Sequence, residues 1–340
     1  MALPRSQIVD LNLTPYYHCV AKCVRGSFLC GYDALTKRDY TYRKKWIEDR
    51  LTFLAEVFAI KICAYAVMSN HFHVVLYVDV DQAKEWDHNE ILYRWGKLFP
   101  NESKKHNVLS ETDRLERIEI CRERLMNLSW FMRCLNEDIA RRSNEEEGCK
   151  GRFWAGRFFS QALLNQSAVL GSMVYVDLNP IRAGIANTPE DSDYTAIKQR
   201  ILCAVETVGV NKNSGAKQEK TSFDNAVQPK TLMPFASKLN QNNVLPHFNL
   251  TLSEYLILVE YTGRMQKADK IGYIPDELPD ILERIKFQPK VWRQFISNIS
   301  GFSYAIGNIH ELKEFGKSGR KRAFKGAGLA RKYMAYSGSR

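Results

Sequence analysis

The sequence predicts an α+β protein with a ferredoxin-like, or RRM-like, antiparallel sheet, helices on one side of that sheet, and a mainly helical C-terminal region. Two observations predict this class. Over residues 1–204 the hydrophobic pattern alternates between strand and helix periods in the order β-α-β-β-α-β, followed by a further helix. With 340 residues, 45% of them hydrophobic, the chain can bury a full core. Its length predicts one large domain with an appended region, or two unequal domains.

The first four elements of this order are a strand, an amphipathic helix and a β-hairpin. The strands are short runs rich in aromatic and β-branched residues, and the helix repeats apolar residues at helical spacing. Only Ser69 and Asn70 separate the last two strands, which predicts a hairpin, although Asn-Gly would be a stronger turn signal. The expected elements are a strand at 16–24, a helix at 39–59 with Trp46, Leu51, Leu54 and Phe58 on one side, and strands at 61–68 and 71–78.

The remaining elements of the first domain are mostly helical. The pattern is helical from 81 to 146, and the second half of the glycine-bounded run 148–164 predicts a strand. Residues 165–186 predict one more helix. This helix is expected to begin at one of two capping residues and to stop at one of two helix breakers: Asn165 or Ser167, and Pro180 or Gly184.

A polar stretch of low periodicity at 205–243 predicts a linker between a domain at 1–204 and a C-terminal region at 244–340. The expected helices of the C-terminal region lie at 250–265 and 277–299. The last thirty residues hold nine Lys or Arg against two Glu. The tail at 317–333 is therefore interpreted either as a flexible basic arm that adds sequence-independent affinity for DNA or as an ordinary solvated tail.

The composition narrows the class of partner and the compartment. The net charge, +11, indicates an anionic partner, and nucleic acid is the first expectation for a chain without a membrane-binding signature. No run approaches the roughly 18 apolar residues of a membrane span, and the first residues do not have the pattern of a signal peptide, so a cytoplasmic location is expected. Eight cysteines without paired CxxC motifs predict reduced thiols, most of them in the core.

Two histidines, His71 and His73, open the second strand of the predicted hairpin. Residues i and i+2 of a strand point to the same face, so the two imidazoles are expected side by side, with Phe72 and Val74 facing the core. Two imidazoles in this arrangement can hold one divalent ion. The alternative is a pair of ordinary, half-exposed strand histidines.

A second constellation lies about a hundred residues later, in MVYVDLNPIRAG at 173–184. If the helix continues through Asn179, then Tyr175 and Asn179 are i and i+4 residues on one helix face. A tyrosine hydroxyl can attack phosphorus, and an amide oxygen one turn away can complete a metal site. The alternative makes Tyr175 a core aromatic residue and Asn179-Pro180 a plain helix end.

Together these motifs resemble a known family. HFH at 71–73 resembles the His-hydrophobe-His signature of HUH endonucleases, and YVDLNPIRAG at 175–184 resembles the tyrosine-bearing helix of the single-tyrosine transposases. The overall order, which includes MSNHFHVVL and GRFWAGRFFSQALL, is most similar to the REP-associated tyrosine transposases of bacteria. The resemblance covers roughly residues 12–200, with a long helical insertion at 79–125.

The resemblance implies an HUH endonuclease fold for residues 1–204 and a transposase or nickase that cleaves and rejoins single-stranded DNA near a REP-like hairpin. Matched residue by residue, Tyr175 is the nucleophile, His71 and His73 are two metal ligands, and Asn179 stands at the third ligand position. The expected cofactor is Mg²⁺ or Mn²⁺, since a closed structural zinc site would usually use cysteines. The expected intermediate is a 5′-phosphotyrosine with a free 3′-hydroxyl.

Two other functions remain open from the residues alone. One is a non-catalytic regulator that binds single-stranded or hairpin nucleic acid through its sheet and basic tail. The other is a metal-dependent hydrolase in which the same histidines activate a water molecule. The resemblance is compatible with a monomer or with a homodimer, and relatives include dimers that exchange tyrosine helices.

Several basic and aromatic residues are candidates for DNA contacts. In GRFWAGRFF, arginines could bind phosphates while aromatic rings stack on unpaired bases, or the rings could simply fill the core. Arg182, seven residues after the tyrosine, could approach the cleaved backbone or be an ordinary surface residue. The candidates are Arg152, Trp154, Arg157 and Arg182, with Lys22 and Arg25 at the end of the first strand as weaker ones.

Overall fold

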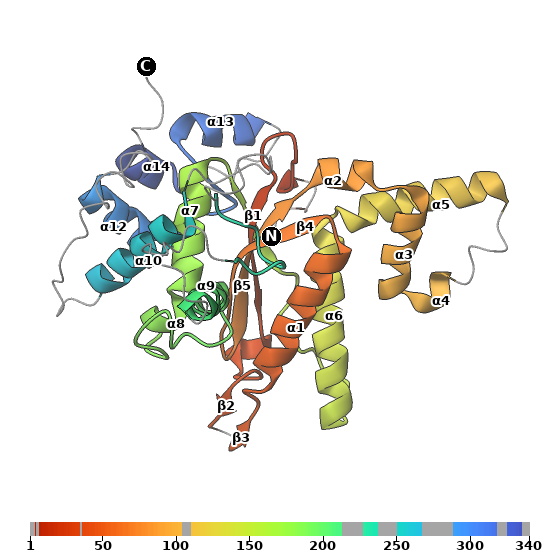
Figure 1. Ribbon diagram of the computed structural model, residues 1–340, viewed down its shortest axis with the longest axis horizontal. Coiled ribbons are helices and arrows are strands. Elements are labelled where there is room, and N and C mark those ends of the chain that lie inside the picture. Colours follow the sequence, from red (N-terminus) through yellow and green to blue (C-terminus); the bar gives the residue numbers. More distant parts are fainter. Residues whose placement is uncertain are drawn as a thin grey trace. The chain divides into compact units, whose positions relative to one another are not determined.

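The computed structural model of the protein has an α+β fold built on a five-stranded mixed sheet (Figure 1). It describes residues 4, 7–34, 36–103, 110–212, 227–236, 250–266, 288–317 and 325–334. Within these ranges, no helix is both long and apolar enough to cross a membrane.

The sheet has the strand order β4-β5-β1-β6-β7. The predicted hairpin is present, and its second strand has the predicted bounds. At the other edge β7 pairs in parallel with β6, with Ala162 opposite Ala305 and Leu163 opposite Ile306. The prediction of a purely antiparallel sheet is wrong at this edge, because the C-terminal region adds a parallel strand. The strands are β1 (Tyr16–Lys22), β4 (Ile60–Val67), β5 (His71–Val78), β6 (Phe159–Leu163) and β7 (Ala305–Ile306), and a separate antiparallel pair consists of β2 (Tyr32–Asp33) and β3 (Arg38–Asp39).

The residues group into two compact units. The histidine-hairpin unit comprises Cys19–Ile62 and Val67–Phe159. The tyrosine-helix unit comprises Met1–His18, Cys63–Ala66 and Ser160–Arg340. The predicted linker at 205–243 begins within helix α9 (Ala196–Lys212), and its residues 213–226 and 237–243 lie outside the described part of the chain. The predicted domain boundaries stay predictions.

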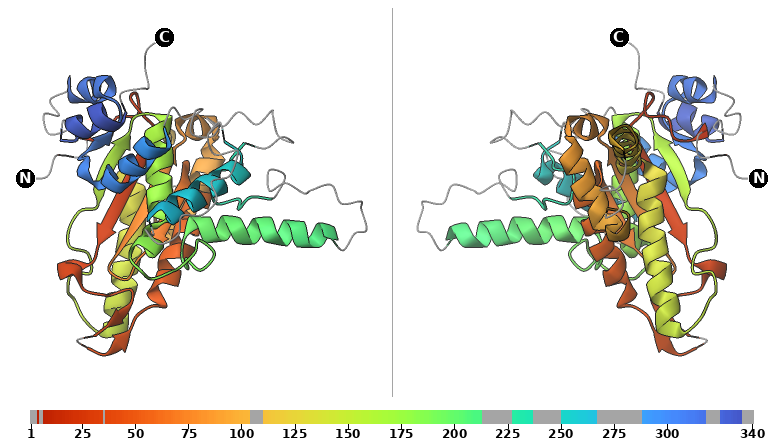
Figure 2. Two further views of the ribbon diagram at one scale, coloured as in Figure 1. Left: turned by 90° about the vertical axis from the view of Figure 1, so that its left-hand side faces the viewer. Right: turned by 90° about the vertical axis from the view of Figure 1, so that its right-hand side faces the viewer.

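In the histidine-hairpin unit, helices α1 (Arg43–Val57) and α6 (Leu128–Glu147) lie side by side (Figures 1 and 2). The run predicted as helical at 81–146 is divided into several helices, and a polar side chain caps the start of most of them. The capping residues, each accepting a hydrogen bond from a backbone amide of the first turn, are Asp79, Asp87, Ser110 and Asn127. The helices before α6 are α2 (Val80–Glu85), α3 (His88–Leu98), α4 (Pro100–Ser103) and α5 (Glu111–Leu125).

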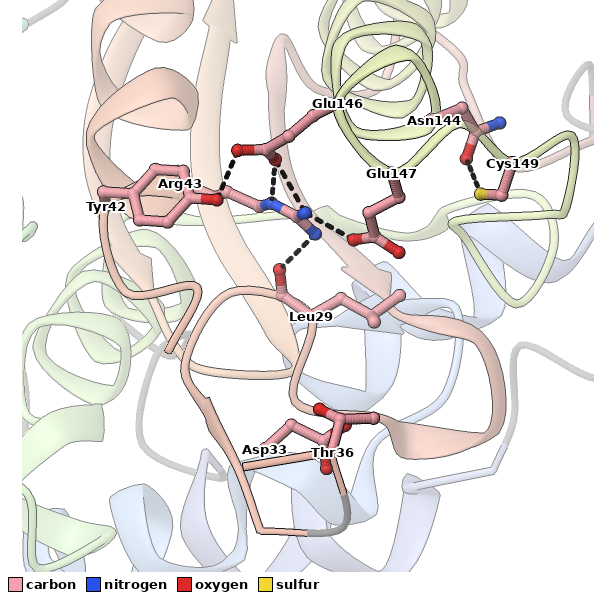
Figure 3. Close-up of polar contacts among 9 residues, drawn as sticks. All are labelled: Leu29, Asp33, Thr36, Tyr42, Arg43, Asn144, Glu146, Glu147 and Cys149. Carbon is pink, nitrogen blue, oxygen red and sulfur yellow. Dashed lines mark hydrogen bonds and ion pairs between the residues drawn. The ribbon is translucent and has the colours of Figure 1, made fainter. Parts of the chain in front are cut away.

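A buried arginine ties the start of α1 to the end of α6 (Figure 3). The Arg43 side chain is fully buried, and its Nε donates to Glu146 at 3.0 Å. Its guanidinium also pairs with Glu147 and donates to the Leu29 carbonyl at 3.2 Å. The Tyr42 hydroxyl donates to the Glu146 carboxylate. Because a buried charge without a partner is strongly destabilising, these carboxylates fix where the two helix ends meet.

In the tyrosine-helix unit, helix α7 (Gln166–Asp177) packs on α10 (Leu252–Gln266) and α12 (Pro289–Asn298), which lie beside it in Figures 1 and 2. The approach to α12 is close at Gly171, where an added Cβ would lie 2.4 Å from the Phe295 ring. Of the two predicted caps, Asn165 and Ser167, the structure shows Asn165, which accepts a hydrogen bond from the Ala168 amide at 2.8 Å. Helices α10 and α12 of the C-terminal region are therefore packed against this helix.

The predicted C-terminal elements are partly confirmed. Helices α10 and α12 correspond to the two expected helices, although residues 277–287 lie outside the described ranges. Helix α13 (Ile309–Lys317) leads into the basic tail, of which residues 318–324 are not described. Residues 325–334 contain helix α14 (Ala327–Tyr333), whose Ala330 and Tyr333 are buried. This part of the tail is therefore a packed helix and not a flexible arm.

All eight cysteines are free thiols, and six of them are buried. Cys149 is exposed and Cys203 is half-buried. The prediction of reduced, mostly core thiols is confirmed.

Candidate functional site

The two histidines of the hairpin form a compact pair on β5. The ring centroids of His71 and His73 lie 4.9 Å apart with the ring planes 77° from parallel. Their neighbours Phe72, Val74 and Leu76 are completely buried, so the strand alternates as the sequence predicted. His73 is 8% exposed, and His71 is half-buried. The predicted side-by-side arrangement of the two imidazoles is confirmed.

The protonation state of His71 suits a metal ligand. Burial, and to a smaller extent the positive charge of Lys22 at the end of β1, lower the pKa of His71 to about 4. The imidazole is therefore neutral near pH 7, and an imidazole must be neutral to coordinate a metal.

The donors around this pair fit a cation that is only partly enclosed by protein. Among the described residues, no three His, Cys, Asp or Glu side chains form a group that could hold a metal ion. Two imidazoles without a thiolate do not make a closed structural zinc site. They leave positions for oxygen ligands from an amide, water or phosphate, which Mg²⁺ and Mn²⁺ prefer.

The turn that leads into His71 brings one more polar group to the pair. The side-chain oxygen Oδ1 of Asn70 lies 2.6 Å from Nδ1 of His71. The same amide donates from Nδ2 to the Gly26 carbonyl at 3.2 Å. Sequence reasoning treated Asn70 only as a turn residue, and no periodicity indicates that its side chain contacts the histidine.

The tyrosine of the second constellation lies between two other side chains in its own unit. Tyr175, on α7, is half-buried. The His18 ring of β1 stands edge-on to it, with 6.3 Å between ring centroids. The Arg182 guanidinium lies over its face, 4.3 Å from the ring centroid. Tyr175 is thus packed and oriented by two cationic or polar groups, and it is not an enclosed core residue.

His18 and Gln161 are polar residues of this site that the sequence did not reveal. Burial lowers the pKa of His18 to about 4, and a hydrogen bond with the Gln161 side chain partly opposes this shift. Gln161 in turn donates to the Ser303 carbonyl at 2.6 Å. The available signal was a single histidine inside an apolar strand, which is also typical of an ordinary core histidine.

The helix of Tyr175 ends earlier than expected. α7 stops at Asp177, Leu178 has φ −88° and ψ 1°, and Asn179 begins a separate turn, α8 (Asn179–Arg182). The reason is Pro180, which has no amide hydrogen to donate to the carbonyl four residues earlier and whose ring clashes with that carbonyl, so one unbroken helix cannot pass through it. The condition that one continuous helix carries Tyr175 and Asn179 is therefore not met. The later stop at Gly184 is confirmed for the two helices together, since this residue has φ +68°.

The Asn179 amide has an unsatisfied polar atom. Its Nδ2 is buried and has no hydrogen-bond partner among the described residues. Oxygen and nitrogen of an amide are assigned by their hydrogen bonds, so a rotated amide would place Oδ1 at this position. An unpaired amide oxygen fits the oxygen ligand that the sequence predicts for Asn179.

A buried carboxylate ends the tyrosine helix. The Tyr255 hydroxyl of α10 donates to Asp177 Oδ2 at 2.5 Å, while Asp177 Oδ1 has no partner among the described residues. Burial raises the pKa of Asp177 to about 7, against the opposing effects of this hydrogen bond and of the Arg200 charge. Arg200 is itself fully buried and donates to the Cys63 and Met233 carbonyls at 3.0 and 2.9 Å. Only the presence of an aspartate inside an apolar helix signalled this contact in the sequence.

The proposed DNA-contact residues divide into exposed cations and a buried ring. Trp154 is 8% exposed, and its Nε1 donates to the Asn136 carbonyl at 2.8 Å. Its ring stands edge-on to Phe72, with 5.5 Å between centroids. A base could stack on Trp154 only if this packing opened. The exposed cations are Lys22, Arg25, Arg152, Arg157 and Arg182.

No protein-family model matches the chain, and no curated protein matches it either. Among solved structures, the chain is similar to a REP-associated tyrosine transposase bound to a REP hairpin. The similarity covers 63% of this chain and 91% of that chain, at 14% sequence identity and a TM-score of 0.34. A likeness of this size is distant and carries no argument about fold or activity by itself.

Proposed function

We propose that the protein is a DNA transposase or nickase that cleaves and rejoins single-stranded DNA near a hairpin through a 5′-phosphotyrosine intermediate. The observation that carries the proposal is a pair of adjacent imidazoles, His71 and His73, in a chain whose Tyr175 packs under a guanidinium. The first is a metal-binding pattern and the second orients a nucleophile beside a phosphate-binding group.

The proposal includes a ferredoxin-like fold of the HUH type. Its support is the position of β5 between β4 and β1, which splits the unit formed by β1, α1 and β4. A split β-α-β unit is the mark of ferredoxin-like sheets. Strand β7 is then an addition at the far edge.

Strand β1 supplies one residue to each of the two clusters. His18 of β1 contacts Tyr175, and Lys22 of the same strand acts on His71. The side chains of residues 18, 20 and 22 point to the same face of the strand, because successive side chains alternate between its two faces. We propose His71, His73 and Asn179 as the residues that would hold Mg²⁺ or Mn²⁺; when bound, the cation would polarise the scissile phosphate and offset negative charge in the transition state.

The protein's own groups perform the transfer. The Tyr175 Oη attacks the phosphorus and gives up its proton, while the bond from phosphorus to O3′ breaks and O3′ takes a proton as a free 3′-hydroxyl. Arg182 holds the tyrosine ring and places a positive charge beside the phosphate. Arg152, Arg157, Lys22 and Arg25 would bind the phosphates of the flanking strand.

The test is covalent trapping on a hairpin oligonucleotide with a single-stranded flank. With Mg²⁺ or Mn²⁺ the wild-type protein should form an adduct that survives SDS, and Tyr175→Phe should abolish it. Tyr93→Phe is the matched control, because this tyrosine of α3 is 60% exposed and belongs to neither cluster. An undiminished adduct in Tyr175→Phe contradicts the assignment of the nucleophile.

The same assay separates the other functions. Cleavage that leaves no protein attached indicates a hydrolase with an attacking water. Hairpin binding that is insensitive to chelator, without cleavage at any metal concentration, indicates a regulator.

A further inference from the structure

The backbone of the hairpin turn is fixed by the loop that follows β1. We call residues 23–31 the β1 loop. The Cys23 amide donates to the Asn70 carbonyl at 2.8 Å, and the Cys30 amide donates to the Ser69 carbonyl at 2.9 Å. At Gly31, an added Cβ would lie 2.5 Å from Ser69 Cβ, so the loop and turn are in contact that only glycine permits. Both turn residues are therefore held from outside the hairpin.

The side chain of Asn70 is oriented by the same loop. Its Nδ2 donates to the Gly26 carbonyl at 3.2 Å. A carbonyl only accepts hydrogen bonds, so the amide end that faces Gly26 is the NH₂ group and the end that faces His71 is the oxygen. Gly26 has φ +69°, a conformation that favours glycine and that aims its carbonyl at Asn70. The hydrogen bond to Gly26 therefore fixes the orientation of the Asn70 amide.

An oxygen facing the ring determines which nitrogen of His71 carries the proton. Asn70 Oδ1 can only accept, and it lies 2.6 Å from His71 Nδ1. A neutral imidazole has one protonated nitrogen and one with a free lone pair. With the proton at Nδ1, the lone pair is at Nε2. Partners of this kind orient the histidine ligands of metal sites and raise their basicity.

We propose that Asn70 is a positioning residue that fixes the Nδ1–H tautomer of His71 and so presents Nε2 to the divalent cation. The part that concerns the cation rests on the proposed function, whereas the tautomer is a property of the metal-free protein. The β1 loop thereby serves the site by orienting the Asn70 side chain. The proposal also gives a physical role to the Asn-His order in the turn sequence MSNHFH.

The direct test is nitrogen NMR on the full-length, metal-free protein with nitrogen-15-labelled histidine. His71 should show a protonated Nδ1 and an unprotonated Nε2 in the wild type. A protonated Nε2 in the wild type overturns the proposal without any variant. Asn70→Ala should give a mixture of tautomers, and Asn70→Asp should restore the protonated Nδ1, because a carboxylate oxygen also accepts from it.

The second measurement is the affinity for Mn²⁺ in the absence of DNA, followed by calorimetry or electron paramagnetic resonance. Asn70→Ala should weaken binding by about 10-fold to 100-fold, the effect expected for losing such a partner, and Asn70→Asp should restore it. Ser69→Ala is the matched control in the same turn and should leave the affinity unchanged. Equal affinities in wild type and Asn70→Ala overturn the proposal.

Melting temperatures of the variants complete the design. If Asn70→Ala lowers the melting temperature, the comparison is made between wild type and Asn70→Asp, where an Nε2–H tautomer of His71 in the aspartate variant contradicts the proposal. If the wild-type protein has the proton of His71 at Nδ1 but forms no covalent adduct, only the proposed function fails. An adduct in a protein whose His71 carries its proton at Nε2 is a failure of the positioning role alone.

Discussion

His71 and His18 are both strand histidines with lowered pKa values, yet their surroundings differ. Burial lowers the pKa of each to about 4, so both rings are neutral near pH 7. His71 lies next to a second imidazole, and its Nδ1 faces the side-chain oxygen of Asn70. His18 lies next to Tyr175 and bonds with Gln161. The charge state alone therefore does not assign a role, whereas the neighbours distinguish the proposed metal ligand from the residue that contacts the proposed nucleophile.

The largest expected difference between the two histidines is in metal affinity. His71→Ala should weaken Mn²⁺ binding by at least about 100-fold, because losing a ligand should cost no less than losing its hydrogen-bonding partner. His18→Ala should leave Mn²⁺ affinity unchanged and slow only adduct formation, since its ring contacts Tyr175. Calorimetry with Mn²⁺ and the adduct assay give the two readouts. Equal losses of Mn²⁺ affinity in both variants would remove the distinction.

The pH dependence of stability distinguishes the histidines by burial. The pKa of His18 is about 4 in the folded protein and about 6.5 when unfolded, so the unfolded chain binds a proton that the folded chain refuses. Protonation of His18 in the unfolded chain therefore does not affect stability above pH 6.5. As the pH falls from 6.5 to 4, it lowers the free energy of unfolding by about 3 kcal/mol.

Urea unfolding of wild type and His18→Gln at pH 7 and pH 4 measures the part of this pH dependence that His18 causes. The free-energy difference between the two proteins should change by about 3 kcal/mol between these pH values. His71→Gln, measured with chelator present, should show a smaller change because that ring is partly exposed. A difference that does not vary with pH would show that His18 is not held neutral.

The hydroxyl of Tyr255 supports the tyrosine side of the comparison through Asp177. Tyr255→Phe removes the 2.5 Å hydrogen bond and should lower the free energy of unfolding by about 1.5 to 3 kcal/mol. Mn²⁺ affinity should change far less than in His71→Ala, because the hydrogen bond holds Asp177, which is not one of the proposed ligands. Urea unfolding and Mn²⁺ titration check both statements. Tyr93→Phe, at a tyrosine of α3 that is 60% exposed, is the control, and a stability loss of equal size in it would argue against a specific role for the Asp177 contact.

The smallest expected effect concerns Arg182, which is exposed and lies over Tyr175. Arg182→Gln should reduce the slope of log affinity against log salt for hairpin DNA by about one, as expected for one lost phosphate contact. Lys84→Gln, a change at an exposed lysine of α2, should not alter the slope. Binding measured at several salt concentrations decides this. An unchanged slope in Arg182→Gln would restrict the arginine to holding the tyrosine ring.

The hairpin shows what a sequence can predict. Its second strand has the expected bounds, and the His-Phe-His alternation follows from a period of two that any strand imposes. A cap at this position could also be predicted, because capping depends on a side chain two or three residues from the amide it binds. Local rules of this kind need no knowledge of the rest of the chain.

The residues that were missed depend on distant contacts. The partners Gln161 and Tyr175 of His18 come from other elements of the chain, and Asp177 pairs with Tyr255 across 78 positions. Pro180 indicated the break before Asn179, but the sequence was equally compatible with a helix that ends at Gly184. Trp154 could equally be a stacking platform or a core ring, and burial places it in the core of this structure.

Strand β7 protects an edge of the sheet. The Ala162 and Leu164 amides of the β6 segment donate to the Tyr304 and Ile306 carbonyls at 2.8 and 2.9 Å. In a chain that ended before Tyr304, these amides would face solvent as an open edge, and open edges recruit strands from other molecules. The short C-terminal strand thus acts against self-association, and shortened versions of the protein are expected to aggregate through β6 even where the site residues are intact.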